Sequence, residues 1–273
     1  GKYDAFLFDC DGVIFEGEVA IPGSIEALNY LEAQGKKVYF VTNNASKSRE
    51  SNANKLIGLG YNASVEQVYG TSYAAPLYIK RYAPHVNHIF AIGSNEFKSD
   101  LRNAGFKLTT VADVPDLTLE NLMTIQPDPS IQLVISALSV SFTYLEGLYA
   151  SSCIQNGAEY ISCNYDAFLP YKPFNLPGSG CIKAFLETAT GTKAKIVGKP
   201  ERFIFDLIAE KEQLDPSRYL MVGDRLDTDI LFGINSGIDT ALVLTGAATR
   251  REAEDSEYKP TYISEDLARL IRP

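Results

Sequence analysis

The sequence predicts an α/β fold: a Rossmann-like doubly wound parallel sheet core with an inserted α/β cap domain. Short apolar runs alternate with helix-patterned segments in both terminal parts of the chain, which is the order of a parallel sheet covered by helices. A middle block breaks this alternation. The length of 273 residues also exceeds the usual size of one domain, about 100–150 residues, so we expect a second domain within the chain.

The N-terminal part of the chain supplies three strand–helix pairs. Residues 5–9 (AFLFD) form a short apolar run, as expected for a strand buried on both faces. In the helix predicted over 24–34, Ile25, Leu28 and Leu31 recur at helical spacing, and Gly35 follows as a helix-ending residue. The further elements predicted here are strand 38–42, helix 46–59, strand 67–70 and helix 73–82.

The same alternation returns near the C-terminus. The predicted order is strand 195–197, helix 202–212, strand 219–222, helix 227–235 and strand 240–244. Together with the N-terminal strands, these elements build one parallel sheet with helices on both faces. In such sheets the functional side chains gather at the carboxyl ends of the strands, so the residues that follow each strand carry the functional interpretation.

The middle block is predicted to be a second α/β domain. It contains strand 88–92 with helix 94–104, a less regular stretch over 109–130, and a strand–helix–strand unit over 133–138, 142–155 and 159–163. We therefore expect a core domain made of residues 1–84 and 193–273, interrupted by an inserted domain of residues 85–192.

Composition excludes several classes of protein. The formal net charge is −9 and the isoelectric point is near 4.9, which argues against a nucleic-acid binder because phosphate contacts need a basic face. A small anionic substrate remains compatible, since one local positive site can override the overall charge. Only His85 and His88 are histidines, so Ser-His-Asp and Cys-His hydrolases and histidine-rich zinc sites are disfavoured.

Cysteine usage and hydropathy bear on the compartment. The four cysteines form no CxxC pair and no disulfide framework, which favours a reducing, cytoplasmic environment. No signal peptide is expected from the first residues. The longest uncharged stretch, 129–145, is too short and too polar to span a bilayer, so no membrane association is expected.

Two carboxylates lie at the end of the first predicted strand, in the run Asp9-Cys10-Asp11-Gly12. Because side chains alternate along an extended chain, both carboxylates can face one side while Cys10 points into the core. Gly12 allows the backbone to turn and to approach a ligand closely. Such a pair indicates a metal site, a nucleophile with its acid/base partner, or both, whereas the alternative is a plain acidic turn.

Two further strand ends carry groups that suit an oxyanion. Thr42-Asn43-Asn44 offers a hydroxyl and amides ahead of a helix, a pattern that also fits a helix N-cap with an Asx turn. Lys199 lies between a short predicted strand and a helix, where a lysine is either a phosphate-binding point charge or a solvated surface residue.

The predicted strand 219–222 runs into Gly223 and a group of carboxylates. Asp224 suits a hard cation, with Asp229 near or behind it. Asp227 is explained by the favourable effect of an acidic residue in the first turn of a helix. The glycine again permits close approach of the backbone to a ligand.

In order along the chain, four strand ends carry DxDGV, TNN, GKP and GDxxxxD, and this combination resembles the haloacid dehalogenase (HAD) superfamily of aspartate-nucleophile phosphatases. The resemblance covers nearly the whole chain. Segments 21–24, 42–49, 178–180 and 222–230 are similar to the branch that holds eukaryotic phosphoglycolate phosphatase, pyridoxal phosphatase and p-nitrophenylphosphatase. That branch places a C2-type cap between the second and third motifs, where the middle block lies.

The resemblance implies a Mg²⁺-dependent phosphomonoester hydrolase. Asp9 is implied to be the nucleophile that forms an aspartyl-phosphate, and Asp11 the general acid and base. Mg²⁺ is implied to bind Asp9, the carbonyl of Asp11 and Asp224, with Asp229 orienting the metal ligands. Without a cation, a dianionic substrate would be repelled by these carboxylates.

The resemblance also implies which residues bind the substrate. Thr42, Asn43, Asn44 and Lys199 are implied to hold the phosphoryl oxygens. The cap loop of the branch aligns with residues 164–170, where phosphoglycolate phosphatases carry Leu at the position of Leu169 and pyridoxal phosphatases carry His. The chain departs from the branch at 137–140, where a Gly-x-Asp-Pro pattern is usual.

The substrate expected first is therefore 2-phosphoglycolate, within the class of small phosphorylated metabolites. The alternatives are a pyridoxal 5′-phosphate phosphatase, a broad-specificity 4-nitrophenyl phosphatase, or an inactive ligand-binding or scaffolding member of the family. The branch also implies a homodimer through the cap, with the uncharged stretch 133–144 forming either a buried cap strand or an interface edge.

Overall fold

The computed structural model describes residues 1–114, 118, 120–121, 124–169 and 174–271, and it confirms the predicted fold class. The chain divides into two compact units. Unit 1 comprises Gly1–Thr42, Arg49–Gly70 and Gly198–Pro273. Unit 2 comprises Asn43–Ser48 and Thr71–Val197. Among the described residues, no helix has both the length and the apolar character needed to cross a bilayer.

Unit 1 is built on a parallel sheet that, within the described residues, has six strands in the order β15-β14-β13-β1-β4-β5. The sheet grows outward in both directions from β1, so the strand order reverses between β1 and β13. In doubly wound sheets this switch point opens a crevice at the carboxyl ends of the strands, where ligands bind. The strands are β1 (Ala5–Phe8), β4 (Lys37–Thr42), β5 (Val68–Gly70), β13 (Tyr219–Gly223), β14 (Asp239–Val243) and β15 (Tyr262–Ser264).

The strands of unit 1 are apolar because helices cover the sheet. Phe6, Phe8 and Phe40 belong to one buried cluster together with side chains of the helix α1. The segment before β1 contacts β15, since the Tyr3 hydroxyl lies 3.0 Å from that of Tyr262. The helices are α1 (Ser24–Ala33), α2 (Arg49–Gly58), α7 (Phe203–Glu212), α8 (Leu231–Ser236), α9 (Arg250–Asp255) and α10 (Leu267–Leu270), and a small hairpin is formed by β2 (Phe15–Glu16) and β3 (Val19–Ala20).

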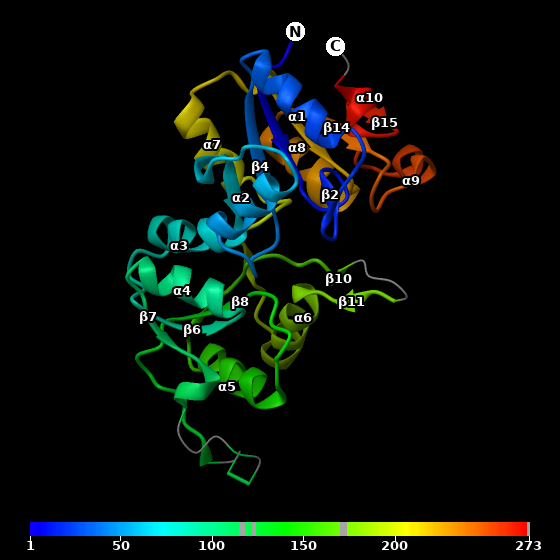
Figure 1. Cartoon of the computed structure of the whole chain (residues 1–273). Coiled ribbons are helices and arrows are strands. Elements are labelled where there is room, and N and C mark those ends of the chain that lie inside the picture. The colour runs from blue at the N-terminus through cyan, green and yellow to red at the C-terminus, as the bar shows by residue number, and fades with distance from the viewer. Residues whose placement is uncertain (115–117, 119, 122–123, 170–173, 272–273) are drawn as a thin grey trace. The chain divides into compact units, whose positions relative to one another are not determined.

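Unit 2 has a parallel sheet of its own, with five strands in its described part, ordered β12-β9-β8-β6-β7. The helices α5 and α6 pack beside each other, as do α3 and α4 (Figure 1). The strands are β6 (His88–Ile92), β7 (Lys107–Thr109), β8 (Leu133–Ser136), β9 (Glu159–Ser162) and β12 (Lys195–Ile196). The helices are α3 (Thr71–Tyr82), α4 (Asn95–Asn103), α5 (Tyr144–Gln155) and α6 (Ser179–Thr190), and β10 (Phe168–Leu169) pairs with β11 (Leu176–Pro177).

One predicted strand lies in a different sheet from the one expected. The run 195–197 was assigned to the core sheet, but β12 pairs with β9 in unit 2, and the Val197 N–H donates to the carbonyl of Ser162 at 3.2 Å. A two-residue strand carries too little pattern to specify its partner, so a non-local contact decides it. For the stretch 133–144, the structure decides between the two alternatives in its first part. There, β8 is a buried strand between β6 and β9 and not an interface edge.

Two predicted helices also begin differently. Helix α2 starts at Arg49 rather than at residue 46, because the Asn44 side chain accepts hydrogen bonds from the N–H and hydroxyl of Ser46. The helix predicted from Asp227 opens instead with a π-helical turn over Leu226–Ile230, which α8 continues. This wider turn carries Asp229.

The compact units differ from the predicted domain ranges at each boundary. Residues 71–84 and 193–197, predicted in the core, pack with the inserted sheet, and so does the short segment Asn43–Ser48. The assignment of unit 1 as the catalytic core and unit 2 as a specificity cap stays a prediction.

Candidate active site

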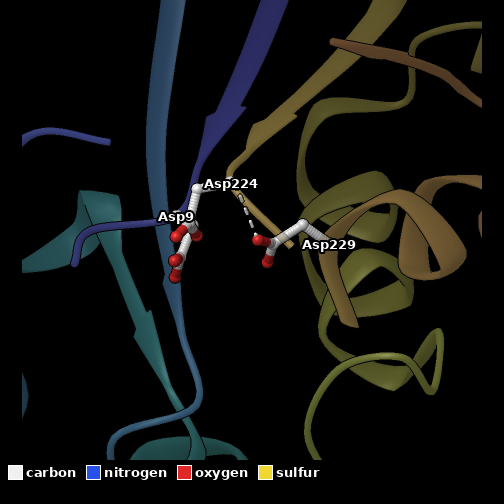
Figure 2. A group of neighbouring side chains, drawn as sticks. All are labelled: Asp9, Asp224 and Asp229. Carbon is white, nitrogen blue, oxygen red and sulfur yellow. Dashed lines mark hydrogen bonds between the residues drawn. The ribbon is translucent and has the colours of Figure 1, made fainter. Parts of the chain in front are cut away.

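Three carboxylates meet at the switch point of the unit 1 sheet. Asp9 directly follows β1 and Asp224 directly follows β13, the two neighbouring strands at which the strand order reverses. Asp229, on the π-helical turn, completes the group, and one carboxylate oxygen of each lies within 4.8 Å of the others (Figure 2). The sheet topology therefore concentrates negative charge where this fold binds ligands.

Lys199 lies between two of these carboxylates. Its Nζ donates to Oδ1 of Asp9 and to Oδ1 of Asp229, both at 2.7 Å, and the residue is only 2% exposed. Burial of the lysine opposes its charged form, but the two carboxylates outweigh burial and raise its pKa, so the ammonium is retained. The alternative of a solvated surface lysine is excluded by this burial.

Asp229 holds neighbouring groups in place through both of its carboxylate oxygens. Its Oδ2 accepts hydrogen bonds from the backbone N–H groups of Asp224 and Arg225, each at 3.1 Å, and Figure 2 shows the first of these. Its Oδ1 is engaged by Lys199. A Cβ on Gly223 would lie 2.1 Å from the Cβ of Asp229, so this close approach requires glycine. These contacts support the orienting role implied for Asp229.

Asp224 is the carboxylate with unfilled coordination capacity. Its Oδ2 accepts from the Ala247 N–H at 2.7 Å, whereas its Oδ1 is buried and has no hydrogen-bond partner among the described residues. A Cβ on Gly246 would lie 1.9 Å from Oδ2, so no larger residue fits there. Burial first, and then the charge of Asp229, raise the pKa of Asp224 to about 7. A buried carboxylate oxygen without a hydrogen-bond partner could bind a cation.

The nucleophile candidate is buried in the same way. Desolvation raises the pKa of Asp9 well above its usual value, and the charges of Asp229 and Asp224 add to this effect, while Lys199 opposes it. Among the described residues, the three carboxylates of this cluster outnumber the one ammonium group that pairs with them, that of Lys199. A divalent cation would offset the excess negative charge and favour the ionised carboxylates.

The loop after β14 contributes to the site, although we did not predict it. Thr245 donates from its hydroxyl to the Gly12 carbonyl at 2.6 Å, and Gly246 and Ala247 contact the Asp224 carboxylate. Gly12 has a φ of +81°, and a Cβ there would lie 2.5 Å from Oδ2 of Asp224. The available signal was a glycine two residues beyond the predicted strand 240–244, the same arrangement that marked the other strand ends.

Asp11 lies beyond the end of the strand. The N–H groups of Val13, Ile14 and Phe15 all converge on the carbonyl of Cys10, so the chain turns here instead of remaining extended. The Asp11 side chain is exposed to solvent, and Cys10 is buried as predicted. Crowding by nearby protein raises the pKa of Asp11, opposed by the charges of Lys55 and Lys199. A raised pKa and access to solvent suit a group that exchanges protons.

The second motif is divided between the two units. Thr42 is the last, buried residue of β4 in unit 1, and Asn43 and Asn44 begin the segment that packs with unit 2. The Asn43 carbonyl accepts from the Thr71 hydroxyl at 2.8 Å, and its side-chain Nδ2 donates to Oδ2 of Asp166 at 3.1 Å. Sequence reasoning did not single out Asp166 as a functional residue.

Leu169 lies on the β10–β11 hairpin of unit 2. It is 39% exposed and is paired in register with Leu176, which is 38% exposed. Phe168 and Phe174 are also exposed on this hairpin, so it presents an apolar surface. Pro170, the last residue of the predicted cap loop, lies outside the described residues.

Comparisons with known sequences agree with this geometry. The sequence model of the haloacid dehalogenase-like hydrolase family matches residues 6–107, and a HAD-hydrolase-like model matches residues 196–270. Glycerol-3-phosphate phosphatase of Homo sapiens is 37% identical over 268 residues, covering 93% of this chain and 83% of its own. Phosphoglycolate phosphatase 2 of Arabidopsis thaliana is 34% identical over 280 residues, covering 98% and 92%.

Solved structures of phosphatases are also similar in fold to this chain. A 4-nitrophenylphosphatase from Thermotoga maritima superposes with a TM-score of 0.86 at 28% identity, covering all of this chain and 97% of its own. A glycerol phosphate phosphatase from Mycobacterium tuberculosis, in complex with magnesium, superposes with a TM-score of 0.83 at 28% identity, covering 99% and 78%. The similarity extends over both units of the chain.

Proposed function

The chain belongs to the haloacid dehalogenase-like hydrolases and is a phosphatase. We propose that it hydrolyses phosphomonoesters of small metabolites through an aspartyl-phosphate on Asp9. The observation that carries this proposal is the buried Lys199, held between Asp9 and Asp229 beside the unpaired oxygen of Asp224. A structural ion pair needs no third carboxylate with an unsatisfied oxygen, whereas a phosphate-handling site needs both a fixed nucleophile and room for a cation.

The proposed reaction has two steps. A carboxylate oxygen of Asp9 attacks phosphorus and forms the P–O bond as the bond to the alkoxide leaving group breaks, and Asp11 gives that alkoxide its proton. Asp11, now ionised, then takes a proton from a water molecule as that water attacks phosphorus, which releases inorganic phosphate and restores Asp9. Lys199 holds the attacking carboxylate in one orientation throughout, which lowers the entropic cost of reaching the in-line geometry.

The phosphoryl oxygens are assigned to Thr42, to the backbone N–H groups of Asn43 and Asn44, and to Lys199. Thr42 is held at the carboxyl end of β4, which lies next to β1 in the sheet. Amide donors and one ammonium charge stabilise the negative charge on a phosphoryl group.

The donor set fits Mg²⁺. Asp9, the carbonyl of Asp11 and Asp224 would hold the ion, because all three offer hard oxygen ligands and Asp224 has a buried oxygen without a partner. When bound, Mg²⁺ would screen the carboxylates from the phosphate and stabilise charge that develops on its oxygens. The magnesium-bound structural relative from Mycobacterium tuberculosis supports this assignment.

For the substrate we propose 2-phosphoglycolate first. Leu169 carries the residue type that the phosphoglycolate phosphatases have at this position, and one relative bears that name. The relatives also suggest glycerol 3-phosphate and 4-nitrophenyl phosphate as candidates, and pyridoxal 5′-phosphate remains the alternative for an aromatic substrate.

Steady-state hydrolysis of these four esters, each with Mg²⁺ and with excess chelator, tests the proposal. We expect turnover that requires Mg²⁺ and the highest kcat/KM for 2-phosphoglycolate. Equal kcat/KM for all four esters would contradict a dedicated phosphoglycolate phosphatase while leaving the reaction intact. Undiminished turnover in chelator would contradict the metal assignment.

A further inference from the structure

The segment that follows β4 is held by side chains of unit 2. The Thr71 hydroxyl donates to the carbonyl of Asn43, that of Ser72 to the carbonyl of Lys47, and that of Ser94 to the carbonyl of Ser46. In addition, the Ser48 N–H donates to a Glu96 carboxylate oxygen at 2.8 Å. The loop that contains the proposed phosphate contacts Asn43 and Asn44 is thus organised by unit 2, not only by the strand it follows.

Asp166 links its side chain directly to that of Asn43. The Nδ2 groups of Asn43 and Asn164 both donate to Oδ2 of Asp166, the first at 3.1 Å. The Ser179 hydroxyl in turn donates to Oδ1 of Asn164. Asn43, Asn164 and Ser179 are all buried, so this chain of hydrogen bonds is largely shielded from water and correspondingly costly to break.

The backbone of Asp166 is fixed independently of its side chain. Its carbonyl accepts from the Gly180 N–H at 2.9 Å, and a Cβ on Gly178 would lie 2.1 Å from that same oxygen. The start of α6 therefore packs against the Asp166 peptide too closely for any residue but glycine. A carboxylate on such a fixed backbone can hold a partner in one orientation.

We propose that Asp166 is a positioning residue for the substrate phosphate, which it serves by fixing the Asn43 carboxamide and with it the loop of Asn43 and Asn44. This inference rests on the proposed function of that loop as the phosphate-binding segment. Asp166 lies three residues before Leu169, so the segment that carries the specificity residue also sets the geometry of the phosphate contacts.

The chemistry of the aspartate fits a tether and not a direct phosphate contact. A carboxylate only accepts hydrogen bonds and would repel a phosphate dianion, whereas it is well matched to two amide donors on one oxygen. Because Asn43 donates from Nδ2, its carboxamide orientation is also determined. Loss of Asp166 should therefore disturb phosphate binding for every substrate alike, since the leaving group is not involved.

The test uses the full chain with inorganic phosphate as a competitive inhibitor and the four esters as substrates. Asp166→Ala should weaken the inhibition constant for phosphate about five- to tenfold, the loss expected for one hydrogen bond, and lower kcat/KM for all four esters by one common factor. Asp166→Asn keeps an acceptor oxygen, so its phosphate inhibition constant and its kcat/KM values should stay within about twofold of those of the parent. The double variant Asn43→Ala/Asp166→Ala should be no worse than Asn43→Ala, because the two side chains act together.

The matched control is Asp128→Ala, which removes another loop-organising aspartate of unit 2, one that accepts from the N–H and hydroxyl of Ser130. It should leave phosphate inhibition unchanged. If Asp166→Ala does not fold, Asp166→Ser, which is too short to reach Asn43, takes its place.

Three results would overturn the proposal. An ester-dependent loss in Asp166→Ala would place the residue against the leaving group, and additive losses in the double variant would remove the link to Asn43. The phosphate inhibition constant could also be unchanged in Asp166→Ala but raised in Asn43→Ala. This result would contradict the positioning role of Asp166 and would still support phosphate binding by the loop of Asn43 and Asn44. If the phosphate inhibition constant is unchanged in Asn43→Ala as well, both the phosphate-binding role proposed for the loop and the positioning role of Asp166 are contradicted.

Discussion

The two parallel sheets of this chain have the same kind of architecture but very different carboxyl ends. In unit 1 the switch-point strands β1 and β13 end in Asp9 and Asp224, and a buried oxygen of Asp224 has no partner among the described residues. In unit 2 the adjacent strands β8 and β9 end in neutral groups, where the Ser136 hydroxyl lies 2.9 Å from the Tyr160 hydroxyl and donates to that of Ser162.

The difference shows that a doubly wound sheet provides a place for a site but not its chemistry. The hydroxyls of Ser136, Tyr160 and Ser162 hydrogen-bond one another, so they stabilise the sheet. The carboxylates of unit 1 leave an excess of negative charge and an unfilled oxygen. Chemistry is therefore expected where the polar groups are incompletely satisfied, and the predictions below test each side of this contrast.

The largest effect is expected for Asp9→Asn. An amide cannot form the aspartyl-phosphate, so kcat should fall by about 10⁴-fold or more in a steady-state assay. Asp4→Asn is the matched control, because Asp4 precedes the same strand β1 at its opposite end and pairs with Lys36 and Arg218. It should retain turnover close to that of the parent. An Asp9→Asn variant with more than about a tenth of the parent's kcat would rule out Asp9 as the nucleophile.

Lys199→Met should affect both stability and activity. Removal of the ammonium leaves Asp9 and Asp229 buried without their partner, which costs about 3–5 kcal/mol of unfolding free energy. Urea unfolding followed by circular dichroism measures this loss. Adding Asp229→Asn should recover part of it, since one uncompensated charge disappears. An unchanged unfolding midpoint in the single variant would show that the lysine does not balance these carboxylates.

Asp224→Asn should weaken Mg²⁺ binding about 10- to 100-fold, because the amide replaces a charged ligand whose free oxygen faces the proposed ion. Titration calorimetry with Mg²⁺ gives the affinity without reference to turnover. Asp227→Asn serves as the control, because the exposed Asp227 carboxylate pairs with Arg225. Equal affinity in the two variants would move the metal site away from Asp224.

A smaller effect is expected on the hairpin of unit 2. Leu169→His introduces a polar group at an exposed apolar position and should shift the ratio of kcat/KM for 2-phosphoglycolate over pyridoxal 5′-phosphate by about three- to tenfold toward the latter. Leu176→His alters the directly paired residue of similar exposure. If both variants shift the ratio equally, polarity of the hairpin and not residue 169 determines the preference.

The smallest effect concerns the neutral polar groups of unit 2. His88 is buried, its ring nitrogens lie 2.9 Å and 2.8 Å from the hydroxyls of Ser130 and Thr109, and burial lowers its pKa. In the unfolded chain the His88 ring binds a proton near pH 6.5, whereas in the folded chain it does so only at lower pH. Stability should therefore decline as pH falls below about 6.5.

His88→Gln removes this titration, so urea unfolding between pH 7.5 and 5 should show a shallower decline than in the parent. His85→Gln changes an exposed histidine paired with Glu159 and is the control. A decline of equal steepness in His88→Gln and the parent would show that His88 does not contribute to it.

Much of the fold could be predicted because its signals are local. The apolar run of β1 and the helical spacing of α1 lie within single segments, and both elements form close to the predicted limits. The short strand β12 could not be assigned to its sheet, since its partner β9 lies more than thirty residues earlier in the chain. The start of α2 was missed because an Asx turn at Asn44 competes with helix.

The candidate site likewise contains residues that the sequence predicts and residues that only the structure reveals. Asp9, Lys199 and Asp224 were recognisable because each directly follows a strand, and the structure brings them together at the switch point. Asp166 carries no comparable local signal, and the loop of Ala247 carries only the glycine that follows the predicted strand 240–244. Their roles depend on the Asp224 carboxylate and on the Asn43 side chain, which are distant from them in sequence.

The sequence by itself therefore determined the class of fold, the order of the strand ends and the charged residues placed on them, because these properties depend on neighbours along the chain. The tertiary structure alone decided that the Asp224 carboxylate keeps an unfilled oxygen, that residues 43–48 pack with unit 2, and that Asp166 holds Asn43. Burial and hydrogen-bond completion are properties of a three-dimensional neighbourhood, and most of that neighbourhood comes from distant parts of the chain.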